Sequence, residues 1–161
     1  LWIAGEGPLR QELEKKAEEL GVKPRTRFLG WREDAASLIA SGDIFICPSR
    51  HEPLGNVVLE AWAQATPVIA ANSSGPAALI EDNETGILFP IDDALALATA
   101  IKDIIKDVGK RSRIARRGHQ SFKKKYTEKN VVAQYLEFFQ SIVPEVDSDL
   151  NTISEHDVRK S

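Results

Sequence analysis

The chain has 161 residues, of which 42% are hydrophobic and 28% are charged, and its net charge is −3. This composition suits one compact α/β domain and argues against a protein that attracts nucleic acid through its overall charge. No apolar run approaches the roughly 20 residues that span a bilayer, and a single cysteine, Cys47, excludes an internal disulfide.

Short apolar runs alternate with amphipathic segments along the first 90 residues. The runs are too short for buried helices and are bounded by turn residues, which is typical of strands. Where amphipathic segments follow them, apolar residues recur at helical spacing, as in the stretch that Gly21 ends. We expect strands at 1–4, 27–30, 43–49, 67–71 and 87–90, and helices at 9–20, 35–39, 56–65 and 77–80.

The rest of the chain is predicted to be helical. Asp92 is expected to cap a helix that continues to residue 107, and Gly109 is expected to break it. A basic helix follows up to about residue 125, and a last one covers 128–143. Residues 144–161 are polar, acidic and without periodicity, so we expect a flexible acidic tail after a domain of residues 1–143.

Strands that alternate with helices predict an α/β fold with a doubly wound, mainly parallel, Rossmann-like sheet. In such sheets the ligand lies beyond the carboxyl ends of the strands. The site is therefore expected in the loops "GEGP", "LGWRE", "PSRHEPLGN" and "ANSSGP", each of which follows a predicted strand.

The stretch "RHEPLGNVVLEAW" places a carboxylate on each side of a predicted helix start. Glu52 precedes the turn, and Glu60 stands about 6 Å along the helix axis from Asn56. A helix N-terminus favours phosphate, and Gly55 lets a ligand approach the backbone. An ionised carboxylate matches the two hydroxyls of a ribose. The arrangement suits a nucleotide-diphosphate sugar, although both acids are equally consistent with solvated surface charge.

The same region resembles the retaining glycosyltransferases of the GT-B fold, which consists of two Rossmann-like domains. The motif is Glu-x7-Glu at Glu52 and Glu60, in "HEPLGNVVLEAWAQATPVIAANSSGPAALIEDNETGILF". Around it stand "GEGPLR", "FLGW" and "DIFICPS", and the resemblance extends from residue 1 to about 142. It implies a C-terminal domain that binds the nucleotide-sugar donor of such an enzyme.

The resemblance also implies roles for individual residues. Glu60 would accept hydrogen bonds from the ribose hydroxyls, and Glu52 would be the catalytic-site residue at the transferred sugar. Backbone amides of Leu54, Gly55 and Asn56 would meet the sugar or the diphosphate. The base pocket would lie near Gly30 and Trp31, and the phosphate loop would contain Gly5 and Gly7. No cofactor is implied, and no cluster of His, Cys and Asp has metal-ligand spacing, so we expect metal-independent transfer.

Two segments of the family's pattern are not found in the sequence. They are the first, central strand of the sheet, whose following helix contributes a cationic clamp, and the upstream acceptor-binding domain. The chain contains no methionine and begins at a strand. We therefore expect an N-terminally truncated sheet and a chain that is inactive in isolation. Two alternatives remain: a catalytically silent nucleotide-binding subunit or truncated remnant, and a nucleotide-sugar epimerase of the same fold.

The segment "KRSRIARRGHQSFKKK" (110–125) is strongly basic. A solvated helix face is the first interpretation, and peripheral contact with anionic lipid headgroups is the second. No nucleic-acid-binding motif accompanies it. The expected partners are a nucleotide-sugar donor and a glycan or lipid-linked acceptor, in the cytoplasm or at the inner face of the membrane.

Overall fold

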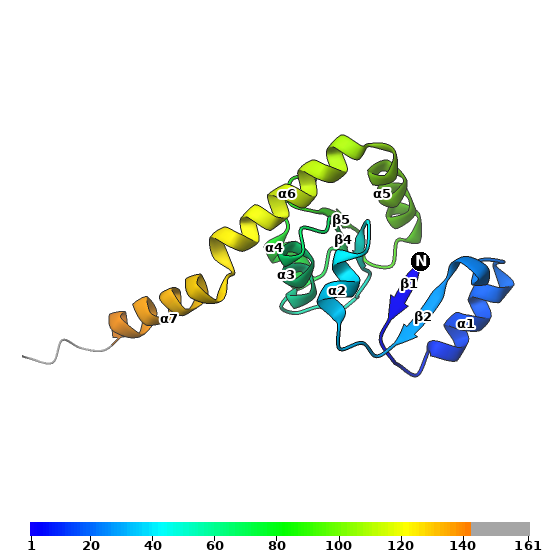
Figure 1. Ribbon diagram of the computed structural model, residues 1–161, viewed down its shortest axis with the longest axis horizontal. Coiled ribbons are helices and arrows are strands. Elements are labelled where there is room, and N and C mark those ends of the chain that lie inside the picture. Colours follow the sequence, from blue (N-terminus) through cyan, green and yellow to red (C-terminus); the bar gives the residue numbers. More distant parts are fainter. Residues whose placement is uncertain (143–161) are drawn as a thin grey trace, which may run out of the picture.

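In the computed structural model, which describes residues 1–142, the first two strands form a parallel sheet of their own. β1 (Trp2–Ala4) pairs with β2 (Arg27–Gly30), and α1 (Arg10–Glu19) with a short 3-10 turn (Lys23–Arg25) connects them. Figure 1 shows this βαβ unit beside the larger body of the domain. The predicted acidic tail lies outside the described residues.

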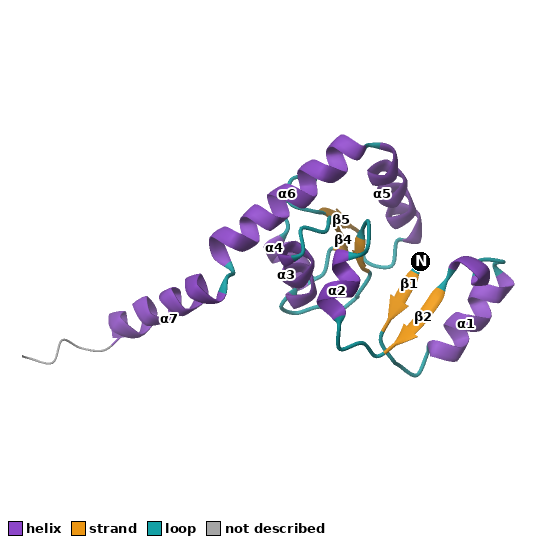
Figure 2. Ribbon diagram, in the orientation of Figure 1, coloured by secondary structure: helices purple, strands orange, loops and turns teal. Residues whose placement is uncertain are grey.

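The second sheet has three parallel strands in the order β3-β4-β5. Helices alternate with them and then continue alone to the end of the described chain (Figure 2). The bounds are α2 (Ala35–Ala40), β3 (Phe45–Cys47), α3 (Asn56–Ala63), β4 (Val68–Ala71), α4 (Ser74–Leu79), β5 (Ile87–Phe89), α5 (Ala94–Lys106), α6 (Val108–Lys125) and α7 (Glu128–Ile142).

The predicted α/β class and the parallel pairing are confirmed, but the strands do not join into one sheet. β1 and β3 are edge strands of two separate sheets. In the order 3-2-1-4-5-6, the central strand would stand between them, which is the strand that the sequence was expected to lack. The break therefore falls at the predicted gap.

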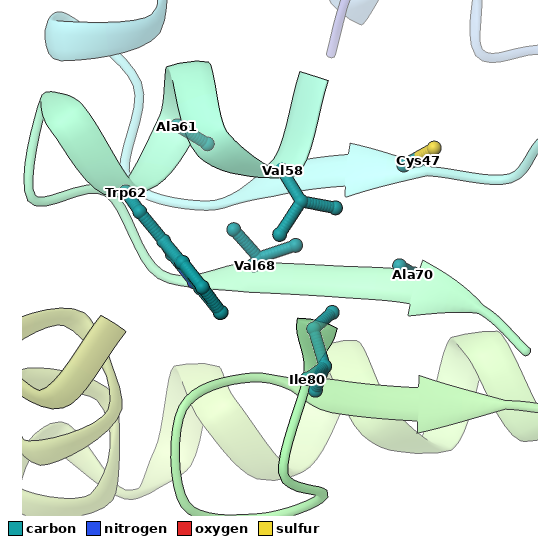
Figure 3. Packing of buried hydrophobic residues seen from close by; sticks show 7 residues of the cluster. All are labelled: Cys47, Val58, Ala61, Trp62, Val68, Ala70 and Ile80. Atoms are coloured by element: carbon teal, nitrogen blue, oxygen red, sulfur yellow. The ribbon is translucent and has the colours of Figure 1, made fainter. Parts of the chain in front are cut away.

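The core lies on both faces of β4, whose four residues are all buried. Val68 and Ala70 pack with Trp62 and other residues of α3, as Figure 3 shows. Ile69 and Ala71 face the other way, into a cluster with residues of α5 and α6. Alternate side chains thus serve opposite faces, which explains why this strand is apolar without interruption.

The starts of α5 and α6 differ from their predicted positions by one or two residues, and α4 begins at Ser74, before its predicted start at residue 77. Asp93, and not Asp92, caps α5, because its carboxylate accepts a hydrogen bond from the amide of Ala96 at 2.8 Å. Asp107 caps α6 by accepting from the amide of Lys110, so the break precedes Gly109, which lies within the first turn of α6. A side-chain cap satisfies an amide that the helix leaves open, and it therefore fixes the start more strongly than a glycine does.

Two helices expose apolar residues. In α1 only Ala17 is buried, whereas Leu13 and the flanking Leu9 and Leu20 are exposed. The last helix, α7, exposes Tyr135, Phe138 and other large apolar residues along its length. None of the helices in residues 1–142 combines the length and apolar character that crossing a membrane requires.

Candidate functional site

The loop after β3 carries Glu52 and folds back on the start of α3. One carboxylate oxygen of Glu52, Oε1, accepts a hydrogen bond from the amide of Gly55 at 2.9 Å. The side chain is only partly exposed, while Oε2 has no hydrogen bond with another described residue. Glu52 is thus held in place by one oxygen and can offer the other to a ligand.

The start of α3 combines a left-handed glycine with open amides. Gly55 is the N-cap with φ = 75°, and its carbonyl accepts from the amides of Val58 and Leu59. Within the described chain, the amides of Asn56 and Val57 form no hydrogen bond. Glu60 is exposed, one turn further along the same helix. The helix therefore presents two donors and a partial positive charge near the two carboxylates.

Gly75, in the first turn of α4, packs directly against this turn. Its amide donates to the carbonyl of Glu52 at 2.7 Å. A Cβ at Gly75 would lie 2.3 Å from the backbone nitrogen of Gly55. A Cβ at Gly55 would in turn lie 2.6 Å from the side chain of Leu79. The space beside Gly55 is therefore already occupied by α4. The two glycines are required by backbone packing, which the sequence motif had not indicated.

Ser73 is the N-cap residue of α4, and its hydroxyl is the one buried side-chain polar atom of the described residues without a hydrogen-bond partner. An N-cap hydroxyl normally accepts from the second or third amide of its helix. Here the second amide, of Gly75, is bonded to Glu52, and the third residue is Pro76, which has no N–H. Because the Gly75 amide donates to the carbonyl of Glu52, it does not donate to the hydroxyl of Ser73.

Arg50 and Asp92 connect the loops that follow β3 and β5. Nε of Arg50 lies 2.5 Å from Oδ1 of Asp92, and both side chains are exposed. The hydrogen bond from Asp92 raises the pKa of the Arg50 guanidinium above its ordinary value. Asp92 adopts φ = 63°, a left-handed conformation that asparagine and aspartate tolerate better than other side chains. The pair fixes the loop that carries Glu52 from a second side.

Arg50→Ala is expected to loosen this loop without destabilising the domain. Exposed ion pairs contribute little to global stability, so the midpoint of thermal unfolding should change little. Hydrogen exchange of the Gly55 and Gly75 amides, which both donate to Glu52, should become faster when it is followed by NMR. Asp92→Asn should have the same effect because it breaks the same pair. Asp34→Asn, which breaks another exposed Arg–Asp pair, is the control, and equal acceleration by all three variants would contradict the prediction.

The glycines predicted for base and phosphate form a second cluster. The amide of Gly5 donates to the carbonyl of Gly30 at 2.7 Å, and the Glu6 carboxylate occupies the space next to Gly30. Trp31 is 77% exposed, which leaves its ring free to stack on a planar ligand. Gly7 follows in an exposed turn. The loops "GEGP" and "LGW" are thus adjacent, as their positions after β1 and β2 predicted.

The two clusters are separate in the described chain, since no hydrogen bond or ion pair between residues of 1–142 joins them. Near the second cluster, Nε and Nη2 of Arg32 donate hydrogen bonds to the two carboxylate oxygens of Asp34, at 2.7 and 2.6 Å. This hydrogen bonding lowers the pKa of the Asp34 carboxyl, and it keeps Asp34 from capping α2 with its side chain. Cys47 is buried in β3, and His51 is exposed.

Comparison with known proteins gives one family match and many relatives. The family model described as "Glycosyl transferases group 1" matches residues 1–107. The chain is 42% identical over 141 residues to the lipopolysaccharide core biosynthesis glycosyltransferase LpsE of Rhizobium meliloti, covering 88% of this chain and 42% of that protein. It is 36% identical over 115 residues to the α-D-kanosaminyltransferase of Streptomyces kanamyceticus, covering 70% and 30% of the two chains.

Solved structures with a similar fold also include complexes with a nucleotide or a nucleotide sugar. Alr3699/HepE of Anabaena in complex with UDP superimposes with a TM-score of 0.83 at 28% identity, covering 88% of this chain and 40% of that one. A further structure of the same protein contains UDP-glucose. The likeness supports the C-terminal Rossmann-like half of a GT-B fold. The chain spans about two fifths of the length of the first relatives it matches.

Proposed function

The chain belongs to the group 1 glycosyl transferases, and on that premise we propose that it is the donor-binding half of a retaining glycosyltransferase. The donor is a nucleotide-diphosphate sugar, and the acceptor is a glycan or lipid-linked saccharide of the cell envelope. Two relatives named for lipopolysaccharide core biosynthesis support the acceptor class. The observation that carries the proposal is the Glu-x7-Glu pair set around the open N-terminus of α3.

In this proposal Glu60 accepts hydrogen bonds from the ribose hydroxyls. Glu52 contacts the transferred sugar through the oxygen that the Gly55 amide leaves free. The amides of Leu54 and Asn56 donate to the sugar or diphosphate, and the Gly55 amide joins them only when it releases Glu52. Gly30 and Trp31 border the base, and Gly5 and Gly7 lie on the phosphate side of the cleft.

The reaction develops negative charge on the departing diphosphate and an oxocarbenium-like sugar. The partial positive charge at the start of α3 stabilises the diphosphate, and oriented amides do so without reorganisation during the reaction. The proposal requires no metal ion. A carboxylate at Glu52 suits the positive sugar ring of the transition state.

The acceptor is proposed to bind a further domain of the same protein, as in two-domain GT-B enzymes, with the reaction in the cytoplasm at the inner face of the membrane. The described chain supplies the donor half of the cleft, so residues 1–161 alone should not turn over. Sugar transfer by the purified chain would contradict the assignment of acceptor binding to a further domain.

The test compares Glu60→Gln with Glu52→Ala in the protein that contains this chain, with UDP as the first probe. Removing a hydrogen bond to a charged group costs about 1.5–3 kcal/mol, so Glu60→Gln should weaken UDP binding roughly tenfold to a hundredfold in calorimetry. Glu52→Ala should leave UDP affinity nearly unchanged and instead lower turnover of the UDP-sugar. Glu12→Gln, an exposed position on α1, is the matched control.

Unchanged UDP affinity in Glu60→Gln would remove Glu60 from the ribose position. If both variants weaken UDP equally, the two ends of the donor have been assigned wrongly. Nucleotide binding without any transfer to an acceptor would favour the catalytically silent subunit over the enzyme.

A further inference from the structure

The helix α6 carries a concentration of positive charge that the donor site does not use. It contains eight Lys and Arg residues and no Asp or Glu over residues 108–125. The chain as a whole carries −3, so the other 143 residues together carry −11. A charge separation of this size within one chain needs its own explanation.

The inner face of α6 is fixed by the core. Ile114 is fully buried, and a Cβ at Gly118 would lie 2.5 Å from the Trp62 ring. Nδ1 of His119 lies 2.8 Å from the carbonyl of Trp62. At 100° per residue, a set of cations that we call the basic stripe covers the helix surface from the face opposite Ile114 to one flank. Its members are Arg113, Arg116, Arg117, Lys123 and Lys124.

Four members of the stripe are exposed, and Arg113 is half-buried. Arg117 and Lys124 lie on the side of the helix that borders Glu84. Arg117 forms an ion pair with Glu84, and it is the one member that contacts a carboxylate of residues 1–142. The stripe spans about 16 Å along the axis at 1.5 Å per residue. Figure 1 shows α6 running along one edge of the body, between α5 and α7.

Helix stability does not account for these cations. Arg113, Arg116 and Arg117 are neighbours at i, i+3 and i, i+4, where like charges destabilise a helix. Lys110 and Arg111 lie in the first turn, at the end of the helix where the dipole disfavours cations. At the other end, side chains of Asn130 and Gln134 already donate to the carbonyls of Lys123, Lys124 and Lys125. The lysines of the last turn agree with the helix dipole, whereas the arginines and the basic residues of the first turn oppose local stability. The arginines therefore indicate a partner.

We propose that the basic stripe binds the anionic headgroups of a phospholipid bilayer and holds α6 parallel to the membrane plane. A row of long, flexible cations on a helix suits a planar array of phosphates. Each cation that lies near the membrane surface adds to the attraction to anionic lipids. The stripe contains no aromatic residue to stack on bases, which argues against a single-stranded nucleic acid. The contact goes beyond donor binding, and it would hold the donor half beside a lipid-linked acceptor.

The experiment is co-sedimentation of the purified 161-residue chain with vesicles of phosphatidylcholine alone or with about one third phosphatidylglycerol. The chain should bind the anionic vesicles, not the neutral ones, and should dissociate as salt rises from about 0.05 to 0.5 M. The variant Arg116→Glu, Lys123→Glu and Lys124→Glu should lose about a hundredfold in partition coefficient, at roughly fivefold or more per cation.

The control variant makes the same charge change at exposed lysines elsewhere, namely Lys15→Glu, Lys16→Glu and Lys102→Glu. It should bind nearly as the unchanged chain does. If the first variant fails to fold, the neutral set Arg116→Gln, Lys123→Gln and Lys124→Gln replaces it and should lose affinity in the same direction.

Three results would overturn the proposal: no binding to the anionic vesicles, equal loss in the control variant, or tighter binding to duplex DNA than to vesicles at the same salt. Vesicle binding needs neither the donor nor Glu52 and Glu60. A failure here would leave the proposed transfer intact, and a failure of the calorimetric test would leave the membrane contact intact.

Discussion

Gly75→Ala is expected to lower the free energy of unfolding of the domain by about 3 kcal/mol, the upper end of the usual cost of inserting atoms into a packed site. The added Cβ would lie 2.3 Å from the nitrogen of Gly55 and 2.6 Å from the carbonyl oxygen of Glu52. Both neighbours are backbone atoms, so no rotamer change can relieve the contact. The turn would have to separate from α4, with loss of the Gly75–Glu52 hydrogen bond.

The same displacement should remove donor binding, because Glu52 and the open amides of α3 share that turn. Chemical denaturation gives the stability, and calorimetry with UDP in the protein that contains this chain gives the binding. Gly42→Ala is the matched control: its nearest neighbour would be 3.4 Å away, so stability should change by only about 0.5 kcal/mol. A Gly75→Ala variant as stable as the control would show that α4 is free to move away.

The sequence was most informative where a local pattern decides the structure. The uninterrupted apolar run at 67–71 predicted β4, and every residue of that strand is buried. The turn "PLGN" predicted the start of α3 at Asn56, and Gly55 is the N-cap residue of that helix. Spacing then placed Glu60 one turn into the helix. In each case the deciding interactions lie within a few residues.

Contacts between distant segments were not predictable in the same way. Arg50 meets Asp92 across 42 positions, and neither residue type indicates the other. Gly75 contacts Glu52 through backbone atoms, which leave no trace in the sequence beyond a glycine. Asp92 and Asp93 are chemically identical, so the choice between them as cap depends on backbone geometry.

Such long-range contacts organise the site. The loops after β3, β4 and β5 meet through the Arg50–Asp92 pair and the Glu52–Gly75 hydrogen bond, and the amide of Asn72 donates to the carbonyl of Phe89. Parallel strands bring their carboxyl ends to one edge, and these bonds fix the loops there. A motif predicts which residues face a ligand, whereas their rigidity comes from loops that the motif does not contain.

Trp62→Ala should be the most destabilising single change of a side chain in the domain, at about 3–5 kcal/mol. The indole is fully buried, and its Nε1–H donates to the carbonyl of Thr85 at 3.0 Å. It packs against Gly118 of α6 and lies 6.4 Å from the Tyr126 ring. Removing it would open a cavity between α3 and α6 and leave the Thr85 carbonyl without a partner. A loss of this size is a large part of the 5–15 kcal/mol that stabilises a typical domain.

Trp31 provides the matched control, because it is the same residue type at 77% exposure. Trp31→Ala should leave the free energy of unfolding within about 0.5 kcal/mol of the parent. If Trp31 borders the base, that variant should bind UDP about 1–3 kcal/mol more weakly, the usual value of stacking on an aromatic ring. The two tryptophans therefore separate structure from binding. Trp62→Ala should lower the free energy of unfolding measured in urea, and Trp31→Ala should lower only the UDP affinity measured by calorimetry. A Trp31→Ala variant that binds UDP normally would move the base away from "LGW", and a stable Trp62→Ala variant would mean that α6 is not anchored on α3.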